Sequence, residues 1–569
     1  MAFRGRAATT FFLVFFTLIL PANAQERSGE VLQQLERKEV LPETKPIKPP
    51  VIEKEEGEKK AKVKYRDAEK IFVKRFKVEG ATLIDEPTIR SLVESFENRK
   101  LALEDINAVA EKITGAYRQR GYLIAYAFIP VQEIKDDTVV IKAIEGRVGS
   151  ISVSGNKHYE SPFIVKHLEQ ARKDPSLMED RLERAILLLN EYPSLNVKTS
   201  LKAGSQPKTT DILATASDKR YISMGLGYDN FGSSTISKHR ASLSLEAGSL
   251  IADGDLLMLR GVTGLDRIDL NKLSYGRAEY LIPVSYNGTK LGVYYADNVY
   301  EAGEYLIPLD INGKAHTAGI YLTHPFIKQR DRTLEVRAGF DYKDMYDYML
   351  DSLNSKDNVR SLNFGASYNF FDALKGRNSI SATWHQGIPY LLGGTGRDGT
   401  GTSRLGASGG FTKFTGDLAR TQMIGEYSYA LIRASGQLSN EELFSVEQFG
   451  IGGMGTVRGF DPSMYSGDSG YVLGAELYFS PLYPDKKIFG RKIGEMLKLV
   501  LFIDHGGVYR NNVQPGEYKV AYLTSAGAGI RVYGGNLFLF RVDCAVPRIN
   551  GNFNASNSVY YLQAMMNFE

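Results

Sequence analysis

Cysteine is almost absent from this chain of 569 residues, since Cys544 is the only one. No intramolecular disulfide can therefore hold a small domain together. Tryptophan also occurs once, and the seven histidines show no spacing typical of a metal site. The net charge of +4 gives no electrostatic case for nucleic acid, so we expect no nucleic-acid partner.

Long apolar runs are equally scarce. Beyond the first residues, nothing approaches the ~18 apolar residues that a membrane-spanning helix needs. The one pronounced run, residues 11–20, follows Arg4 and Arg6 and precedes a small-residue A-N-A box. This order is typical of a secretory signal peptide, which we predict over residues 1–24. A membrane anchor is the alternative, and the short run and clean cleavage box disfavour it.

Glycine and two aromatic residue types are abundant instead: the chain has 56 Gly, 33 Tyr and 28 Phe. With few apolar helical patterns in the second half, these residues favour β-structure. Export, aromatic richness and the lack of apolar helices together predict a barrel in the bacterial outer membrane.

From about residue 220 the hydrophobic pattern has a period of two. Leu499, Leu501 and Ile503 alternate with Val500, Phe502 and Asp504, and the same alternation recurs near residues 361–370 and 537–544. An apolar outer face and a polar inner face are what a lipid-embedded barrel requires, because no backbone edge can stay unpaired in hydrocarbon. Such segments number about 16, an even count typical of bacterial barrels. A soluble β-sandwich is the alternative, and the long strands disfavour it.

The residues before the barrel form two consecutive α/β units with the same order of elements, β-α-α-β-β. In the first unit, Ile106, Val109, Ile113 and Tyr117 recur at helical spacing and predict a helix with one buried face. Strands are predicted over residues 72–78, 122–129 and 138–144 of this unit. The fold class is thus α+β modules followed by an all-β transmembrane barrel.

A short amphipathic stretch precedes the modules at residues 25–40, with Val31, Leu32 and Leu35 among its apolar positions. Residues 41–70 are rich in proline and charge and contain too few large apolar residues to pack, so they predict a linker.

Two motifs resemble enzyme signatures but lack the required context. Gly450, Gly452 and Gly455 match G-x-G-x-x-G, yet Pro462 lies where the following helix would have to run. Residues 406–410 match G-x-S-x-G, but they lead into a strand rather than a helix. We find no catalytic constellation and expect neither enzyme activity nor a metal or cofactor.

Several motifs resemble one family. Residues 457–460, Val-Arg-Gly-Phe, resemble the signature of the long sixth loop in BamA-related transporters, and residues 502–506 resemble the F-x-D-x-G strand motif that accompanies it. Two modules before a 16-stranded barrel resemble the POTRA (polypeptide-transport-associated) domains of two-partner secretion transporters, the FhaC/ShlB/HecB group. This resemblance implies an outer-membrane pore that secretes a partner exoprotein of adhesin or haemolysin type, without ATP.

The resemblance also implies roles for particular residues. In the family, the sixth-loop arginine pairs with the F-x-D aspartate inside the barrel, which here implies Arg458 with Asp504. The alternation independently turns Glu476 inward as a second partner. The full set of site residues is Val457, Arg458, Gly459 and Phe460 of the loop, with Phe502, Asp504, Gly506 and Glu476 on the wall.

The same resemblance makes residues 25–40 a helix that plugs the resting pore. The predicted divisions are a signal peptide (1–24), plug helix (25–40), linker (41–70), POTRA 1 (71–146), POTRA 2 (147–219), and barrel (220–569) with its sixth loop at 435–469. The implied partners are an exoprotein with an N-terminal secretion domain, the barrel assembly machinery that inserts the barrel, and outer-membrane lipid.

Three other functions are weighed against this one. A barrel assembly factor of the same superfamily is disfavoured by the presence of only two modules and a plug-like helix. A nutrient porin or receptor would lack paired α/β modules. An outer-membrane hydrolase lacks a credible triad.

Overall fold

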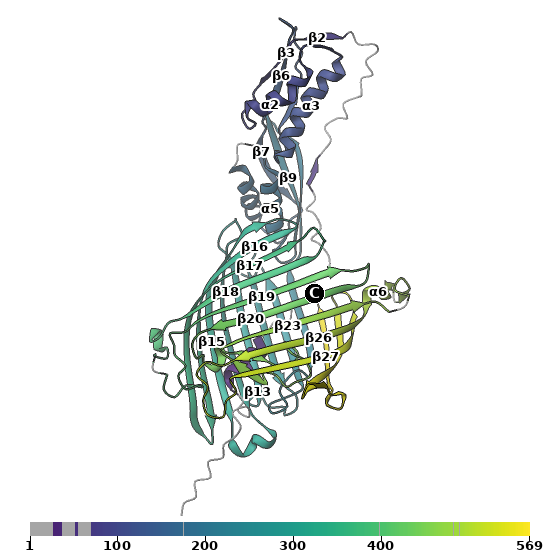
Figure 1. Ribbon diagram of the computed structural model, residues 1–569. Coiled ribbons are helices and arrows are strands. Elements are labelled where there is room, and N and C mark those ends of the chain that lie inside the picture. The colour runs from purple at the N-terminus through teal and green to yellow at the C-terminus, as the bar shows by residue number, and fades with distance from the viewer. Residues whose placement is uncertain are drawn as a thin grey trace, which may run out of the picture.

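The computed structural model describes residues 27–36, 52–54, 70–173, 176–397, 399–481, 483–488 and 490–568. The predicted signal peptide, most of the predicted linker and the ends of the predicted plug helix lie outside these ranges. Figure 1 shows two small modules in line on one end of a large barrel, with the C-terminal strands closing the wall. Among the described residues, no helix is both long and apolar enough to cross a bilayer.

The first module packs two helices against a small sheet of order β3-β6-β5. Strand β3 runs parallel to β6, and β5 runs antiparallel to β6. A separate pair, β2 with β4, lies beside the sheet. The elements are β2 (Ile71–Val73), β3 (Arg75–Glu79), α2 (Glu86–Val93), η1 (Glu94–Phe96), β4 (Arg99–Leu101), α3 (Leu103–Gln119), β5 (Tyr126–Phe128) and β6 (Thr138–Ile144).

Helix α3 forms where the apolar stripe predicts it. Ile106, Val109, Ile113 and Tyr117 are all buried in the module's core. The helix stops at Gly121, whose φ of +86° is the left-handed conformation that favours glycine. The stripe therefore fixes which face of α3 meets the sheet.

The strand predicted over residues 122–129 is largely wrong, because only Tyr126–Phe128 joins the sheet as β5. The backbone N–H of Tyr122 bonds instead to the carbonyl of Tyr117, and that of Leu123 bonds to the carbonyl of Leu177 in the second module. These residues connect the two modules, so their backbone groups are unavailable to the sheet.

The predicted strand 72–78 is broken at Lys74 into β2 and β3. The backbone N–H of Lys74 donates to the carbonyl of Asp137 at 2.8 Å rather than continuing one ladder.

The second module repeats the order of the first. Its elements are β7 (Arg147–Ser154), α4 (Ser161–Leu168), η2 (Glu169–Lys173), α5 (Glu179–Leu189), β8 (Leu195–Ala203) and β9 (Thr209–Asp218). Strand β9 pairs in parallel with β7 and antiparallel with β8.

One strand of this sheet comes from the segment predicted to be a linker. Strand β1 (Ile52–Lys54) pairs in parallel with the outer edge of β8, with Ile52 opposite Thr199. Three residues can supply backbone hydrogen bonds to an existing sheet edge without an apolar core of their own. The composition of residues 41–70 therefore does not indicate this strand.

The barrel has 16 antiparallel strands and closes by pairing its first strand with its last, β10 with β30. The strands are β10 (Tyr221–Asp229), β11 (Arg240–Gly248), β12 (Leu256–Gly264), β13 (Leu273–Pro283), β14 (Lys290–Glu301), β15 (Asn312–Lys328), β16 (Arg332–Met349), β17 (Ser352–Phe371), β18 (Arg377–Gly387), β19 (Thr412–Met423), β20 (Tyr429–Ser439), β23 (Ser469–Phe479), β26 (Leu497–Tyr509), β27 (Val520–Tyr533), β28 (Phe538–Ile549) and β30 (Val559–Phe568).

Short elements occur in the connections between these strands. They are η3 (Glu304–Leu309), η4 (Leu391–Gly393), η5 (Ser445–Glu447), β21 (Phe449–Ile451), β22 (Tyr465–Gly467), β24 (Lys487–Ile488), β25 (Arg491–Lys492), α6 (Ile493–Met496), β29 (Asn552–Phe553) and η6 (Ala555–Asn557).

The alternation of the strands follows the predicted pattern. On β26, Leu501 and Ile503 are each 49% exposed on the outside, whereas Phe502 and Asp504 between them are buried. Strand β26 therefore presents leucine and isoleucine side chains to the bilayer, and Phe502 and Asp504 to the lumen.

Candidate functional site inside the barrel

The connection between β20 and β23, residues 440–468, folds back into the barrel. Its two arms pair as β21 and β22, with Gly450 opposite Ser466. Beyond the pair, Gly452 and Gly453 adopt φ values of +113° and +84°, which side chains rarely allow. The G-x-G-x-x-G spacing therefore belongs to a sharp turn within a loop, and no helix follows it.

Arg458 lies at the tip of this loop and is completely buried. Its Nε donates to Asp504 Oδ2 at 2.6 Å, and its Nη2 donates to Asp504 Oδ1 at 2.9 Å. Nη2 also reaches Glu476 Oε1 at 2.8 Å. The guanidinium stacks on the ring of Phe502, 3.5 Å from its centroid. A bidentate pair with an aromatic face holds the guanidinium in one orientation.

The other residues of the two motifs support this contact. Val457 is buried and packs beside Gly506, where a side chain would crowd its methyl group. The backbone N–H of Gly459 donates to the hydroxyl of Tyr561 at 2.9 Å. Phe460 packs at the edge of the Val457 cluster. The loop tip thus contacts β23, β26 and β30.

A third carboxylate, Asp543 on β28, was not among the predicted site residues. It lies 3.5 Å from Arg458 Nη1 and pairs with Arg531 and Arg541. The sequence alternation does turn Asp543 inward. Alternation gives the face of a strand but not its position around the barrel, so Asp543 could not be assigned to Arg458 in advance.

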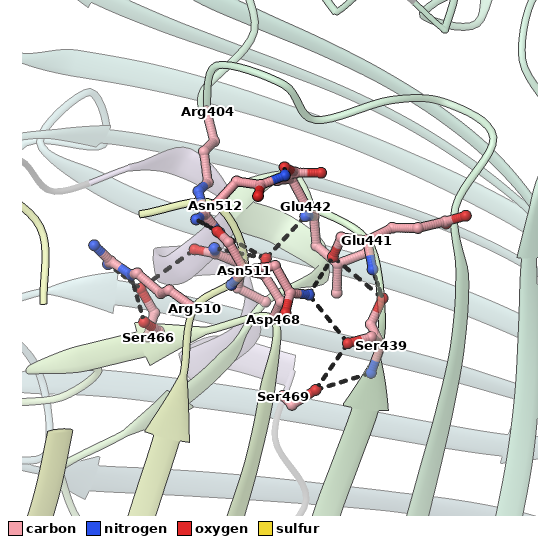
Figure 2. Close-up of polar contacts among 12 residues, drawn as sticks. Arg404, Ser439, Glu441, Glu442, Ser466, Asp468, Ser469, Arg510, Asn511 and Asn512 are labelled. Carbon is pink, nitrogen blue, oxygen red and sulfur yellow. Dashed lines mark hydrogen bonds and ion pairs between the residues drawn. The ribbon is translucent and has the colours of Figure 1, made fainter. Parts of the chain in front are cut away.

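The base of the loop has a second buried ion pair, shown in Figure 2. Arg404 Nη1 bonds both oxygens of Asp468, at 2.7 and 2.6 Å. Asp468 also accepts the backbone N–H groups of Leu443 and Asn511, at 2.9 and 2.8 Å. One carboxylate therefore ties together the connections that follow β18, β20 and β26.

Helix α1 (Ser28–Glu36) lies inside the same lumen. Its apolar residues Val31, Leu32 and Leu35 are buried against Phe444 and other residues of the barrel interior. The backbone N–H of Ser28 donates to Asp347 Oδ1 at 2.7 Å. At the other end of the helix, Glu36 pairs with Arg277 at 3.0 Å.

The helix also contacts the base of the sixth loop directly. Gln33 Nε2 donates to the carbonyls of Val446 and Gln448 at 2.6 and 2.9 Å. Ser466 donates its hydroxyl to Glu30 at 3.0 Å. Gly29 lies so close to Val446 that any side chain on it would overlap the loop backbone. Helix and loop therefore form one packed unit in the lumen.

The second module is bonded to the turns at one end of the barrel. Arg184 donates to the carbonyls of Pro325 and Asn287, and Glu183 pairs with Arg330. His167 bonds the hydroxyl of Tyr192 at 3.0 Å beside this joint. Burial, aided by the charge of Lys290, lowers the pKa of His167 to about 4, so the ring is neutral at neutral pH.

The serine motif at residues 406–410 lies in the connection between β18 and β19, where Gly406 has a φ of +88°. Within the described ranges, no cluster of three or more His, Cys, Asp or Glu residues is arranged to hold a metal ion.

Comparisons with known proteins agree on one family. The sequence model described as haemolysin secretion/activation protein ShlB/FhaC/HecB matches residues 208–532, and that of the ShlB-type POTRA domain matches residues 71–146. The chain is 24% identical over 573 residues to the heme/hemopexin transporter protein HuxB of Haemophilus influenzae strain 86-028NP, covering 96% of each chain. It is 23% identical over 404 residues to the hemolysin transporter protein ShlB of Serratia marcescens, covering 70% of each.

Among solved structures, CdiB from Escherichia coli is similar with a TM-score of 0.71 at 19% identity, covering 95% of this chain and 96% of that one. A POTRA domain, a second α/β module, a closed 16-stranded barrel and a loop folded into the lumen define an outer-membrane transporter. The chain belongs to the haemolysin secretion/activation family ShlB/FhaC/HecB, the outer-membrane transporters of two-partner secretion.

Proposed function

We propose that the lumen is closed at rest by two removable parts, the helix of residues 25–40 and the sixth loop of residues 435–469. Residues 41–70 act as the tether that lets the helix leave. Residues 71–146 and 147–219 receive the cargo, and residues 220–569 form the pore. The proposal rests mainly on Arg458, a fully buried charge whose partners all lie on the inner wall.

Arg458, with Asp504 and Glu476, is the lock that holds the loop in the pore. A buried ion pair costs much of its Coulomb energy in desolvation, so water entering an opening pore can replace its contacts. Val457, Gly459 and Phe460 shape the loop tip for this contact, and Phe502 and Gly506 shape the wall.

The cargo is an exoprotein of adhesin or haemolysin type that carries an N-terminal secretion domain. Its extended chain adds a strand to an edge of a module's sheet, such as β5 of the first module. Folding of the cargo outside the cell then prevents its return, so that transport needs no ATP. Its relatives include proteins named as transporters for heme/hemopexin and for hemolysin, which supports a protein cargo.

The chain itself performs no catalysis in this proposal. The barrel assembly machinery inserts the barrel, guided by the aromatic end of its last strand at Phe568, and outer-membrane lipid surrounds it.

Secretion of a partner exoprotein, sought first in the genes adjacent to this one, tests the lock. Arg458→Ala and Asp504→Ala should each reduce secretion strongly while the barrel still assembles. Arg548→Ala is the matched control, because Arg548 is an exposed arginine outside the lumen and, among the described residues, bonds the nearby carbonyl of Gly551 alone. Unchanged secretion by both lock variants would refute the proposed role of Arg458.

Ion conductance in a planar bilayer tests the plug. Gly29→Val should displace α1, because the added methyl groups overlap Val446, and the pore should then conduct more. Gln34→Ala on the same helix removes polar atoms without adding bulk and should leave conductance low. Equal conductance in both variants would argue against α1 as a plug.

A further inference from the structure

One connection at the module-bearing end of the barrel is unusually long. Residues 480–496, between β23 and β26, are more than twice as long as any other connection at that end. The others are residues 249–255, 284–289, 329–331, 372–376, 424–428 and 534–537. Outer-membrane barrels keep their periplasmic turns short, so a long one signals an added role.

The described residues of this connection, which are 480–481, 483–488 and 490–496, are hydrogen-bonded to one another and to a neighbouring turn. The backbone N–H of Ile493 donates to the carbonyl of Lys486 at 2.9 Å, and that of Gly494 donates to the carbonyl of Pro484 at 2.8 Å. Lys492 Nζ bonds the Tyr427 hydroxyl at 2.7 Å and so fixes the connection to the neighbouring turn. The backbone of the described residues in this connection is therefore held in place.

Three of those side chains are exposed cations: Lys486, Lys487 and Arg491. Across the described part of the chain, none of the three forms an ion pair or a side-chain hydrogen bond. The fourth basic residue of the connection differs, since Lys492 pairs with Asp485 at 3.0 Å. The three cations are thus available to an anion from outside the chain.

Exposed apolar side chains accompany the cations. Tyr483 is 77% exposed and Ile488 is 44% exposed, with Ile488 paired directly opposite Arg491 in the β24–β25 hairpin. Figure 1 shows α6, which follows this hairpin, projecting sideways at the edge of the barrel, away from the two modules. Lipid-facing Leu477 and Leu501 lie on the strands that lead into and out of it.

Cations beside exposed apolar groups at the end of the lipid-facing wall match the border between hydrocarbon and headgroups. We propose that Lys486, Lys487 and Arg491 bind the phosphate-bearing headgroups of anionic phospholipids in the periplasmic leaflet, with Ile488 and Tyr483 entering the interface. A soluble acidic protein would gain nothing from a site that faces sideways along the bilayer.

The site has a mechanical consequence. The connection joins β23, which carries Glu476, to β26, which carries Asp504. Lipid binding at the connection therefore anchors β23 and β26 in the membrane. These are the two strands whose carboxylates hold Arg458 in the lumen.

Native mass spectrometry of the full chain from nanodiscs of phosphatidylcholine and phosphatidylglycerol tests the proposal. Lys486→Gln, Lys487→Gln and Arg491→Gln combined should lower the retained phosphatidylglycerol at least about tenfold, because each cation near a charged bilayer contributes substantially. Lys74→Gln, Lys100→Gln and Lys135→Gln combined remove three exposed charges from the first module and should leave retention unchanged. Lys486→Arg with Lys487→Arg should also retain the lipid.

Equal retention by the two triple variants would overturn the proposal, since the bound lipid would then owe nothing to these cations. It would also be overturned if the first triple variant kept its phosphatidylglycerol but lost binding of an acidic segment of the cargo. Neither outcome bears on the Arg458 lock, which the secretion assay tests separately.

Discussion

The contact at the tip of the sixth loop and the cores of the two modules are built from opposite kinds of side chain. Val109, Ile113 and Ile164 are completely buried inside the modules, whereas Arg458 and Asp504 are completely buried inside the barrel. The outer surfaces are reversed as well, because the barrel wall faces hydrocarbon and the modules face water.

This difference separates the part of the molecule that can open, the loop tip, from the parts that must stay folded, the two modules. An apolar core can be opened only by exposing its surface to water, at about 25 cal/mol per Å². Ion pairs in a pore can exchange their partners for water with far less net cost. The charged contact around Arg458 is therefore suited to releasing the loop tip, and the apolar cores of the modules are suited to staying folded.

The largest effect should come from Asp504→Ala. Removing one partner of a buried ion pair typically costs about 3–5 kcal/mol, because the other charge is left uncompensated. We expect the loop tip to leave the wall, with faster trypsin cleavage after Arg458 and higher conductance.

Asp417→Ala is the matched control, because Asp417 faces the same lumen but is exposed. The double variant Arg458→Ala/Asp504→Ala should destabilise the barrel less than Asp504→Ala alone. A double variant that is worse would mean that the charges do not act as a pair.

A change in a module core should separate stability from gating. Ile113→Ala removes buried methyl groups from α3 and should cost about 2–5 kcal/mol. We expect earlier proteolysis of the first module with no change in conductance. Glu111→Ala, on the exposed face of the same helix, should leave both unchanged; altered conductance with Ile113→Ala would break the proposed division of roles.

Acid should weaken the second module through His167. Its pKa is about 4 when folded and 6.5 in the reference state, so the unfolded chain binds the extra proton as pH falls. The contribution of neutral His167 to the free energy of unfolding should be fully present above about pH 6.5. It should fall by about 1.5 kcal/mol between pH 6.5 and about pH 5.

Limited proteolysis of the second module as a function of pH measures this effect. His167→Asn should remove this part of the pH dependence, while His158→Asn, at an exposed position, should retain it. The same pH dependence in both variants would show that His167 is not responsible.

The smallest effect is expected at the surface of the first module. Lys77 and Glu79 form an exposed pair at 2.7 Å, and such pairs contribute little. Lys77→Ala should leave the proteolysis rate of the module within error, and a large change would contradict the view that module stability lies in its apolar core.

Much of this architecture can be predicted from local pattern. The period of two along β26 fixes which residues face lipid, and the stripe on α3 fixes its buried face. Both patterns predict the burial correctly because each element lies between only two environments. For β26 these are lipid and the lumen, and for α3 they are the module core and water. Residues 122–125 do not follow their pattern, since their backbone groups serve the joint between modules.

The site was only partly predictable. Pairing Arg458 with Asp504 required the family resemblance, and alternation gave only the inward direction of Glu476. Asp543 and the Arg404–Asp468 pair were missed, because their partners come from loops and strands far apart in the sequence.

The order of the modules and the barrel, and the faces of the barrel strands, follow from the periodicity of neighbouring side chains and need no structure to be recognised. Which charges meet inside the lumen depends on the folded barrel. Closing the barrel sets the position of each strand around the axis, and folding the loop back through it brings Arg458 within reach of three carboxylates at once.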